Sequence, residues 1–288
     1  MKLIFRIALF VSAGVFSLFI VSTTHGEKLI SSFVVPTPTP EHRPFPLFTI
    51  RPLPTPTVVH LSSPLVGFCI QAPVIMYHHI ENMDQATREG HASLTVDSTY
   101  FDQHIKYIVE HGYHPISAET LVNALISKQQ LPQKSIVITL DDGYDDVYEN
   151  AYPIAKKYGA IINLMIPTGL MENAGYLRWT QLQEMESSGL VKIYNHTWSH
   201  ASLSSYQRDK IITEVTTAQQ QLKDHALSSP KILFYPYGAY NTEVINILRE
   251  FQFTGAFSTE GGATQCDSFL FSLHRIHAGN ADLSHYSL

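Results

Sequence analysis

The stretch SIVITLDDGY (residues 135–144) decides the fold, because six uncharged and mostly apolar residues run without interruption into two adjacent carboxylates. A run of this length and composition predicts a buried strand. Asp141 and Asp142 would then stand at the end of that strand. Adjacent Asp residues in such a place are more often turn formers or helix N-caps than catalysts, so the stretch indicates a strand more firmly than it indicates a reaction.

A second segment, HTWSH (residues 196–200), places two histidines four residues apart. If its backbone is helical, this spacing puts both imidazole rings on one face. One carboxylate and two imidazoles form a three-ligand set that can hold a catalytic Zn²⁺ and leave a position open for water, while the other carboxylate remains as a base. The chain has 15 histidines, so the spacing alone carries little weight. Only the combination of the two segments points to a metal-assisted hydrolase.

Three motifs of the chain resemble those of the polysaccharide deacetylase (NodB-homology) family, in the family's order. TLDDGY (residues 139–144) is similar to the first motif, with Leu140 where Phe is usual. HTWSH is similar to the second motif, and FYPYG (residues 234–238) is similar to the third. The resemblance covers residues 73–276, and this ordered match is far more specific than any of the motifs alone.

Within the family, the chain resembles most closely the subgroup of bacterial poly-N-acetylglucosamine deacetylases. The opening segment MYH (residues 76–78) carries this similarity, and Arg275 with its following Ile matches the subgroup's ending. Two departures from the wider family accompany it. Phe234 stands where many members have an Arg that orients the base, and SLHRIH (residues 272–277) matches the usual C-terminal acid motif only approximately.

Beyond residue 64, strand-like runs alternate with helical patterns. The predicted strands are residues 74–77, 136–140, 161–166, 191–194, 232–235 and 254–257. The predicted helices are residues 100–111, 118–128, 147–158, 179–187, 204–226 and 241–251. This order predicts an α/β domain with a parallel sheet and helices outside it. The family resemblance implies an irregular (β/α) barrel with about seven parallel strands, whose strand carboxyl ends carry the chemistry.

The resemblance implies a role for each residue of the motifs. Asp142, His196 and His200 resemble the metal ligands, and Asp141 resembles the base that takes a proton from the attacking water. The backbone N–H of Tyr237, with the metal, would hold the oxyanion. Asp141, Asp142, His196 and Tyr237 fall at the carboxyl ends of predicted strands, which agrees with one shared site.

The leaving amine needs an acid, and His78 is the candidate. It follows the predicted strand 74–77 and resembles the histidine that the subgroup places across the metal from the base; His277 is its main rival. Contacts with the sugar are expected from Tyr144, Trp179, Pro236 and Tyr237. For Tyr144 and Trp179, an ordinary place in the core is an equal alternative.

The chain divides into three predicted regions. Residues 1–26 combine early positive charge with an uncharged stretch at residues 7–21, which predicts a signal peptide or an uncleaved signal anchor. Residues 27–64 form a Pro/Thr-rich linker, either extended or disordered. Residues 65–288 form the catalytic domain. Both readings of the first region export the domain, so we expect an extracellular or cell-envelope location, secreted or tethered.

Composition excludes one class of partner and leaves one question open. The net charge is −6 and no basic run occurs, so nothing indicates nucleic-acid binding. Cys69 and Cys266 lie near the two ends of the predicted domain. In an exported protein they can form a disulfide, but two buried thiols fit the sequence equally well.

Together these features predict a metal-dependent hydrolase that removes N-acetyl groups from an N-acetylglucosamine-containing polysaccharide. The polymer, whether biofilm poly-N-acetylglucosamine, peptidoglycan or a chitin-like chain, is not decided by the sequence, and neither is the oligomeric state. Zn²⁺ is the expected metal, with Co²⁺, Ni²⁺ or Fe²⁺ as alternatives. Two other functions stay open: a catalytically silent carbohydrate-binding or cell-wall protein on the same barrel, and an acetyl-xylan esterase.

Overall fold

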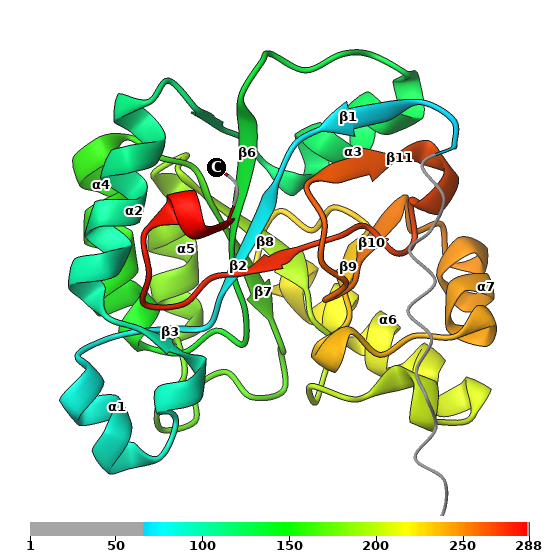
Figure 1. Cartoon of the computed structure of the whole chain (residues 1–288). Helices are drawn as coiled ribbons and strands as arrows, with labels where there is room; N and C mark the ends of the chain where they lie inside the picture. Colours follow the sequence, from blue (N-terminus) through cyan, green and yellow to red (C-terminus); the bar gives the residue numbers. More distant parts are fainter. Residues whose placement is uncertain (1–65, 287) are drawn as a thin grey trace, which may run out of the picture. The chain divides into compact units, whose positions relative to one another are not determined.

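The computed structural model describes residues 66–286 and 288. Its centre is a sheet in which seven parallel strands follow the order β10–β9–β8–β7–β6–β2–β12 (Figure 1). These strands are β2 (Val74–Tyr77), β6 (Ser135–Leu140), β7 (Ile162–Ile166), β8 (Val191–Asn195), β9 (Ile232–Phe234), β10 (Gly255–Phe257) and β12 (Ile276–His277). Off this path, β5 (His114–Pro115) pairs in parallel with the start of β6. The predicted α/β class and parallel sheet are confirmed.

The sheet curls until its two edges approach one another. The strand β12 pairs with β2 at one edge, while Leu273, shortly before β12, forms a bridge to Phe257 of β10 at the other. The N–H of Leu273 donates to the Ala256 carbonyl at 2.9 Å, and its own carbonyl accepts from the Ser258 N–H at 2.8 Å. Residues 273–277 therefore pass between the edges, and the sheet forms the predicted irregular barrel with seven parallel strands.

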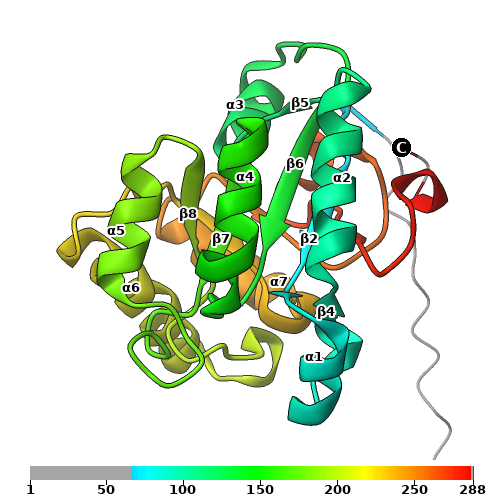
Figure 2. The same cartoon turned by 90° about the vertical axis from the view of Figure 1, so that its left-hand side faces the viewer.

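Helices follow most of the strands and cover the outside of the sheet. They are α1 (Met83–Glu89), α2 (Ser98–Glu110), α3 (Ala118–Ser127), α4 (Tyr152–Tyr158), α5 (Trp179–Ser187), α6 (Arg208–Asp224) and α7 (Thr242–Glu250). Figure 2 shows α2 and α4 side by side across the face of β6 and β7. Side chains in the caps start several helices: Asn82 caps α1, Asp97 caps α2, Ser117 caps α3 and Asn241 caps α7.

The core explains why the apolar runs became strands. All six residues of β6 are buried, because helices cover one face of the strand and the barrel interior covers the other. Ile138 and Leu140 pack in one cluster of buried side chains and Val137 packs in a second. Alternate residues of a strand point to opposite faces, so a strand buried on both faces needs a continuous apolar run rather than an alternating one.

All six predicted strands match the structure within one residue at each end. The predicted helices match less closely in two places. The helix predicted at 147–158 begins with a π-helical turn, η2 (Val147–Ala151), before α4. The helix predicted at 204–226 begins only at Arg208, because residues 203–205 form the 3-10 turn η3 (Leu203–Ser205).

The short elements were not predicted. They are the antiparallel pair β1 (Cys69–Gln71) and β11 (Thr264–Cys266), the parallel pair β3 (His79–Ile80) and β4 (Thr95–Val96), and the turns η1 (Ala92–Leu94), η4 (Pro236–Gly238), η5 (Asp267–Phe269) and η6 (Leu283–Tyr286). Two or three residues are too few to leave a periodic pattern in the sequence.

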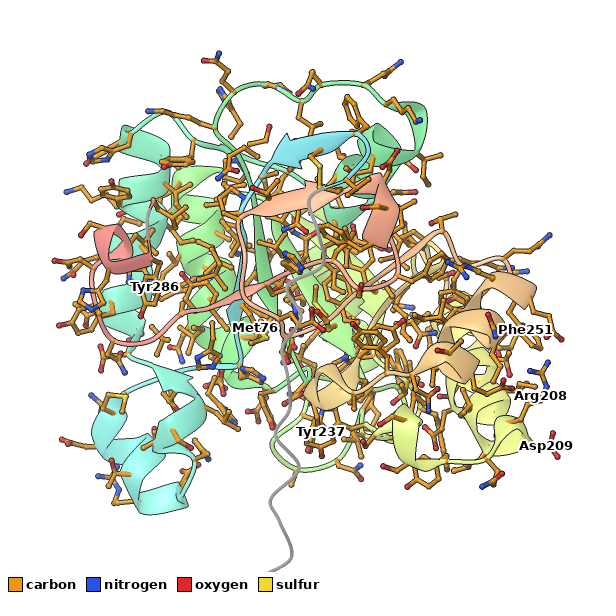
Figure 3. The ribbon with its side chains drawn as sticks, turned by 45° about the vertical axis from the view of Figure 1, so that its right-hand side comes forward. Met76, Arg208, Asp209, Tyr237, Phe251 and Tyr286 are labelled. Carbon is orange, nitrogen blue, oxygen red and sulfur yellow. A yellow bond between two sulfur atoms is a disulfide. The ribbon has the colours of Figure 1, made fainter. Side chains whose placement is uncertain are left out.

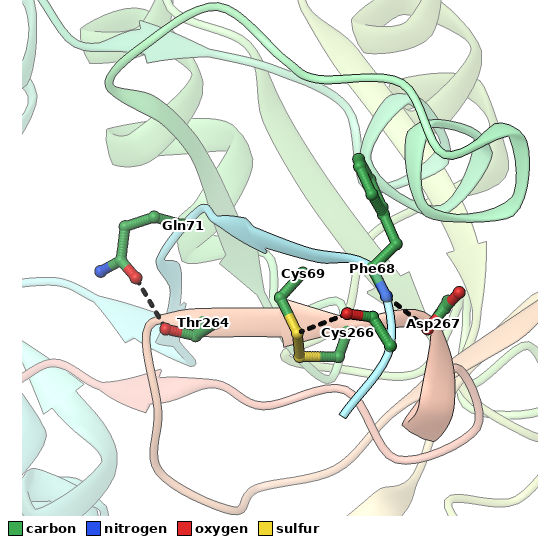
Figure 4. The surroundings of a disulfide bond; sticks show 7 residues. Phe68, Cys69, Gln71, Thr264, Cys266 and Asp267 are labelled. Atoms are coloured by element: carbon green, nitrogen blue, oxygen red, sulfur yellow. Dashed lines mark hydrogen bonds between the residues drawn. A yellow bond between two sulfur atoms is a disulfide. The ribbon is translucent and has the colours of Figure 1, made fainter. Parts of the chain in front are cut away.

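A disulfide joins Cys69 of β1 to Cys266 of β11 (Figure 4). These residues are direct partners in the antiparallel register, and hydrogen bonds flank them on both sides. The N–H of Phe68 donates to Asp267 Oδ1 at 3.0 Å, and the Thr264 hydroxyl donates to Gln71 Oε1 at 2.7 Å. The structure thus selects the disulfide over two buried thiols, and the bridge ties the start of the domain to a segment 197 residues later.

The predicted signal segment (residues 1–26) and linker (residues 27–64) lie outside the described residues, so their assignment stays a prediction. Within the described residues, none of the helices has the length and apolar character that crossing a membrane requires.

Candidate active site

The candidate site lies where several parallel strands end. Asp141 and Asp142 directly follow β6, and His196 directly follows β8. Tyr237 belongs to the turn after β9, and His78 follows β2. Figure 3 shows Tyr237 at the lower edge of the domain, the edge toward which the parallel strands run. The predicted location at the carboxyl ends of the strands agrees with this arrangement.

Asp142, His196 and His200 converge on one point. The Oδ1 atom of Asp142 lies 3.3 Å from Nε2 of His196 and 3.0 Å from Nε2 of His200. Asp142 and His196 are buried, and His200 is partly exposed. One ligand atom from each residue lies within 4.8 Å of the other two, so the group has the dimensions of a metal site.

The hydrogen bonds of the two rings leave the converging atoms free to bind a cation. The Nδ1 atom of His196 lies 2.8 Å from the Phe234 carbonyl oxygen, which can only accept, so the proton of the neutral ring is on Nδ1 and Nε2 carries a lone pair. Nδ1 of His200 is 3.1 Å from the Tyr237 hydroxyl. Asp142 Oδ1 is buried and has no hydrogen-bond partner among the described residues. A buried carboxylate oxygen that faces the lone pair of His196 Nε2 is unfavourable without a cation between them, so the residues present fit a bound metal.

Four residues of the site have backbone angles that most residues avoid. The φ angles are 72° at Asp142, 67° at Thr197, 58° at His200 and 59° at Tyr237. Asp and His tolerate the left-handed region moderately, but the β-branched Thr197 does not. The segment 196–200 is therefore not helical, and the expectation that helical spacing aligns the two rings is wrong. A tight loop with two left-handed residues brings them together instead.

Buried polar groups hold this loop in place. Glu214 of α6 is fully buried, and its carboxylate accepts from both the N–H and the hydroxyl of Ser199 at 2.8 Å. Asn195 accepts from the N–H of Thr197 at 2.8 Å, and the Thr197 hydroxyl accepts from the N–H of Ala201 at 3.0 Å. These bonds over-determine the strained conformation, which is how such strain persists in folded proteins.

Asp141 is held by a buried arginine. Nη1 of Arg275 donates to Asp141 Oδ1 at 2.6 Å, and the Arg275 Nε–H donates to the Ser258 carbonyl at 2.9 Å. Burial alone would raise the pKa of the Asp141 carboxyl, but the Arg275 charge, with His196 and His78, outweighs it and lowers that pKa. Asp141 is therefore ionised at neutral pH and able to accept a proton.

His78 and His277 lie next to each other near Asp141. Their ring centroids are 5.8 Å apart, and the buried Nδ1 of His78 has no hydrogen-bond partner among the described residues. Burial lowers the pKa of His78, although the negative charges of Asp141 and Asp142 act in the opposite direction. The ring is thus protonated in fewer molecules at neutral pH than an ordinary histidine, but is a stronger acid once protonated.

The four predicted sugar-contacting residues lie in different environments. Tyr237 is 69% exposed, and Pro236, its neighbour in η4, is buried. Tyr144 is partly buried and stacks on His79 with ring centroids 3.6 Å apart. Trp179 stacks on His225 at 3.9 Å and packs against the hydrophobic core, and no described contact joins it to the residues above. A contact between these residues and a sugar stays a prediction.

Two residues of the site were missed as such by the sequence reasoning. Glu214 lies in the middle of the long helix α6, and the sequence around it has no motif that marks it as part of the site. Arg275 was noticed only as part of a subgroup ending, not as the partner of Asp141. Its guanidinium lies 5.2 Å from the centroid of the Phe234 ring. Arg275 therefore contacts Asp141 while lying next to Phe234, the residue that stands where many family members have an Arg. The missing Arg at position 234 is the sequence signal that a second arginine could take its place.

Comparisons with known proteins agree with this site. A family model described as polysaccharide deacetylase matches residues 128–256, which include β6 to β9 and the start of β10. YxkH of Bacillus subtilis is 28% identical over 204 residues, which are 71% of this chain and 70% of that protein. A poly-beta-1,6-N-acetyl-D-glucosamine N-deacetylase of Staphylococcus aureus is 27% identical over 195 residues, covering 63% and 67% of the two chains.

The fold of this domain is also similar to that of solved structures. The Streptococcus pyogenes deacetylase PplD, solved in complex with acetate, aligns with a TM-score of 0.68 and 29% identity over 74% of this chain and 93% of that one. IcaB from Ammonifex degensii shares the fold, with a TM-score of 0.63 and 21% identity over 73% and 92% of the two chains. The family model covers the segments that carry Asp141, Asp142, His196, His200 and Tyr237, so residues 128–256 are matched to the polysaccharide deacetylase family.

Proposed function

We propose that this domain is a metal-dependent hydrolase that removes N-acetyl groups from an N-acetylglucosamine-containing polysaccharide. The observation that carries the proposal is the buried Asp142 Oδ1, which has no hydrogen-bond partner among the described residues and faces the Nε2 atoms of His196 and His200. Next to it in the sequence, Asp141 is kept ionised by Arg275. A cation-binding group and an ionised base side by side are what water-dependent amide cleavage requires.

Asp142, His196 and His200 would hold the metal, and an N₂O donor set suits Zn²⁺, with Co²⁺, Ni²⁺ or Fe²⁺ as alternatives. A divalent metal bound there would polarise the acetyl carbonyl and make a water molecule more acidic. The chain's own contribution is to fix the ligands. The Phe234 carbonyl orients His196, and the Tyr237 hydroxyl orients His200. Their rings therefore need little reorganisation when the cation binds.

Asp141 would act as the general base. Its carboxylate is buried and its Oδ1 is engaged by Arg275 at 2.6 Å, so the other oxygen is left to accept a proton from water. The N–H of Tyr237 donates to no acceptor within the described residues, which leaves it available to the oxyanion that forms as the carbonyl is attacked. Tyr237 is the second residue of η4, and the N–H groups at the start of a helical turn have no acceptor within it.

His78 would protonate the departing amine. It follows β2 at the same end of the barrel as Asp141, and its Nδ1 has no protein partner among the described residues. His277, 5.8 Å away between ring centroids, is the rival for this role. An acid is needed only when the leaving group is poor, and this difference separates an acid from a residue that merely supports the site.

The proposed polymer is poly-β-1,6-N-acetylglucosamine, because the Staphylococcus aureus relatives are named for that substrate and the similarity covers most of the domain. The exposed ring of Tyr237 offers a face on which a sugar ring can lie, and the ring of Tyr144 would offer only the face that His79 does not cover. The exposed Tyr237 ring sits 4.7 Å from His200 between ring centroids, so a sugar bound on it would reach the metal group.

Purified protein offered a panel of acetylated glycans tests both the reaction and the polymer. We expect amine release from poly-N-acetylglucosamine, abolished by a chelator and restored by Zn²⁺. Release from peptidoglycan or chitin oligomers alone would overturn the choice of polymer. Acetate release from acetyl-xylan alone would favour an esterase, and binding without release would favour a silent binding protein.

In the same assay, His78→Ala should impair amide cleavage strongly and spare an activated acetyl ester. Equal loss on both substrates, or a larger effect of His277→Ala, would move the acid role elsewhere.

We propose that the domain works outside the cytoplasmic membrane, at the cell envelope or released from it. The Cys69–Cys266 disulfide supports this location, since such bonds persist in oxidising compartments. Mass spectrometry of the native protein, with and without reductant, tests the disulfide and the state of residues 1–26. Recovery of the chain from the cytosol with free thiols and with residues 1–26 intact would contradict the proposal.

A further inference from the structure

A second group of two histidines and one carboxylate lies beside the first. It consists of His79 in β3, Glu81 just after β3, and His91 at the start of η1. One ligand atom from each lies within 4.8 Å of the other two, as in the Asp142 group. The two groups are neighbours, because the Tyr144 ring stacks on His79 only two residues after Asp142.

The environment of His79 is that of a metal ligand. Its Nδ1 lies 2.5 Å from Asp146 Oδ2, and the other oxygen of Asp146 accepts from the Ile80 N–H at 2.9 Å. A carboxylate that holds one ring nitrogen fixes the tautomer and leaves Nε2 with its lone pair, which is the arrangement usual behind metal-binding histidines. The nine-tenths buried ring is further confined between Tyr144 and His91, whose centroid is 4.0 Å away.

Glu81 and His91 complete the group. Glu81 is 5% exposed, and its Oε1 contacts Nε2 of His91. Glu89, at the end of α1, places Oε2 3.9 Å from the same nitrogen and is exposed enough to move closer. A buried carboxylate is costly unless a positive charge compensates it, and His91 is the sole partner of Glu81 among the described side chains.

The surrounding cavity favours a cation. This cavity has a volume of about 740 Å³ and is lined on its acidic side by Glu81, Glu89, Asp145, Asp146 and Glu149. The described residues that line it include no Lys or Arg, so among them only the two histidines can carry positive charge. Five carboxylates around one cavity create a negative potential that a bound divalent ion would relieve.

We propose that His79, Glu81 and His91 form a second divalent-metal site, distinct from the Asp142 group, with Glu89 or water completing the coordination. Two imidazoles and a carboxylate suit Zn²⁺ and its neighbours in the first transition row rather than Mg²⁺ or Ca²⁺. The site is structural: the ion ties β3 to the segment before η1 and fixes the ring on which Tyr144 packs. The rings of His79 and His91 are nearly parallel, so their lone pairs do not point to one place, and the less buried His91 must turn out of the stack for both nitrogens to reach one ion.

Zinc stoichiometry of metal-depleted full-length protein, measured by calorimetric titration and by competition with a chromophoric chelator, tests the proposal. We expect two equivalents for the wild type, one for His91→Ala and one for Glu81→Gln. Glu81→Gln keeps the size of the side chain and its contact with His91, so it remains informative if His91→Ala fails to fold. His114→Ala removes an exposed histidine outside both groups and should retain two equivalents.

The two groups can be told apart in the same experiment. Asp142→Ala should lose one equivalent, and Asp142→Ala combined with His91→Ala should lose both. One equivalent in the wild type that His91→Ala retains, or two in both His91→Ala and Glu81→Gln, would overturn the second site. Two equivalents in Asp142→Ala together with one in His91→Ala would instead leave the second site standing and contradict the metal role of the Asp142 group.

Discussion

The carboxyl ends of the strands and the opposite end of the sheet differ in how many of their polar groups are hydrogen-bonded. At the carboxyl ends of the strands, Asp142 and Tyr237 have left-handed backbones, and Asp142 Oδ1 and His78 Nδ1 have no hydrogen-bond partner among the described residues. At the other end, β1 and β11 pair in regular register, and the Cys69–Cys266 bridge is flanked by hydrogen bonds (Figure 4).

The left-handed residues and unpartnered polar atoms that belong to the proposed site gather at the carboxyl ends of the strands, whereas other left-handed residues, such as Lys128 and Lys134, lie in turns away from it. Such features lower stability, and they persist only where the rest of the fold over-determines them. The disulfide end supplies order without any group suited to catalysis. Changes at the first end should therefore affect activity more than stability, and changes at the second end should do the reverse.

The largest effect is expected from loss of a metal ligand. His196→Ala removes one of the two imidazoles that face Asp142, so metal content should drop by one equivalent. Deacetylation should fall by roughly 1,000-fold or more, because polarisation by a metal contributes several kcal/mol. The unfolding temperature should stay near that of metal-free wild type. His111→Ala, at the exposed histidine that directly follows α2, is the matched control and should change neither quantity. Full metal retention in His196→Ala would sink the assignment.

A smaller effect is expected from Arg275, which lies in the segment between the edges of the barrel. In Arg275→Met, burial still acts on Asp141 but the compensating charge is gone, so the pKa of Asp141 should rise. Because the base must be ionised, the acid limb of the pH profile of kcat/KM should move to higher pH. Arg275→Lys keeps the charge and should move the limb less. An unchanged limb in Arg275→Met would show that Asp141 is not the group that titrates.

The smallest effect on activity is expected at the opposite end. Replacing both Cys69 and Cys266 by Ser should leave deacetylation within about twofold, since the bridge touches no site residue. The free energy of unfolding should fall by about 2–4 kcal/mol, because the bridge closes a long loop. Denaturant unfolding measures this change. Activity lost from a variant that remains folded would refute the separation of the two ends.

The sequence predicts the parts of this molecule that depend on local patterns. Strand β6 is apolar on both faces and was located within one residue, and helix α5 was located with its bounds as observed. The placement of Asp141 and Asp142 follows from the strand before them. Family motifs then supplied the two histidines as their companions, and the structure brings these side chains together.

The remaining parts depend on contacts between residues far apart in the chain. The loop that carries His200 takes its shape from Glu214 and Asn195, so its left-handed residues have no local signal. Arg275 reaches Asp141 from 134 residues away, because the curled sheet brings residues 273–277 between its edges. The group around His79 is short-range in sequence, but two-residue strands leave no pattern that reveals it.

The central claim is that two adjacent carboxylates have different roles, with Asp142 binding the metal and Asp141 acting as the base. Asp141→Asn and Asp142→Asn are the most direct test, since each keeps the shape of the side chain and Asn tolerates the left-handed backbone of Asp142. Metal content and deacetylation should be measured on the same samples. The account predicts that Asp141→Asn keeps its metal and loses roughly 10²–10⁴-fold in rate, while Asp142→Asn loses both metal and activity. Metal lost from Asp141→Asn and retained by Asp142→Asn would show that the two roles are reversed.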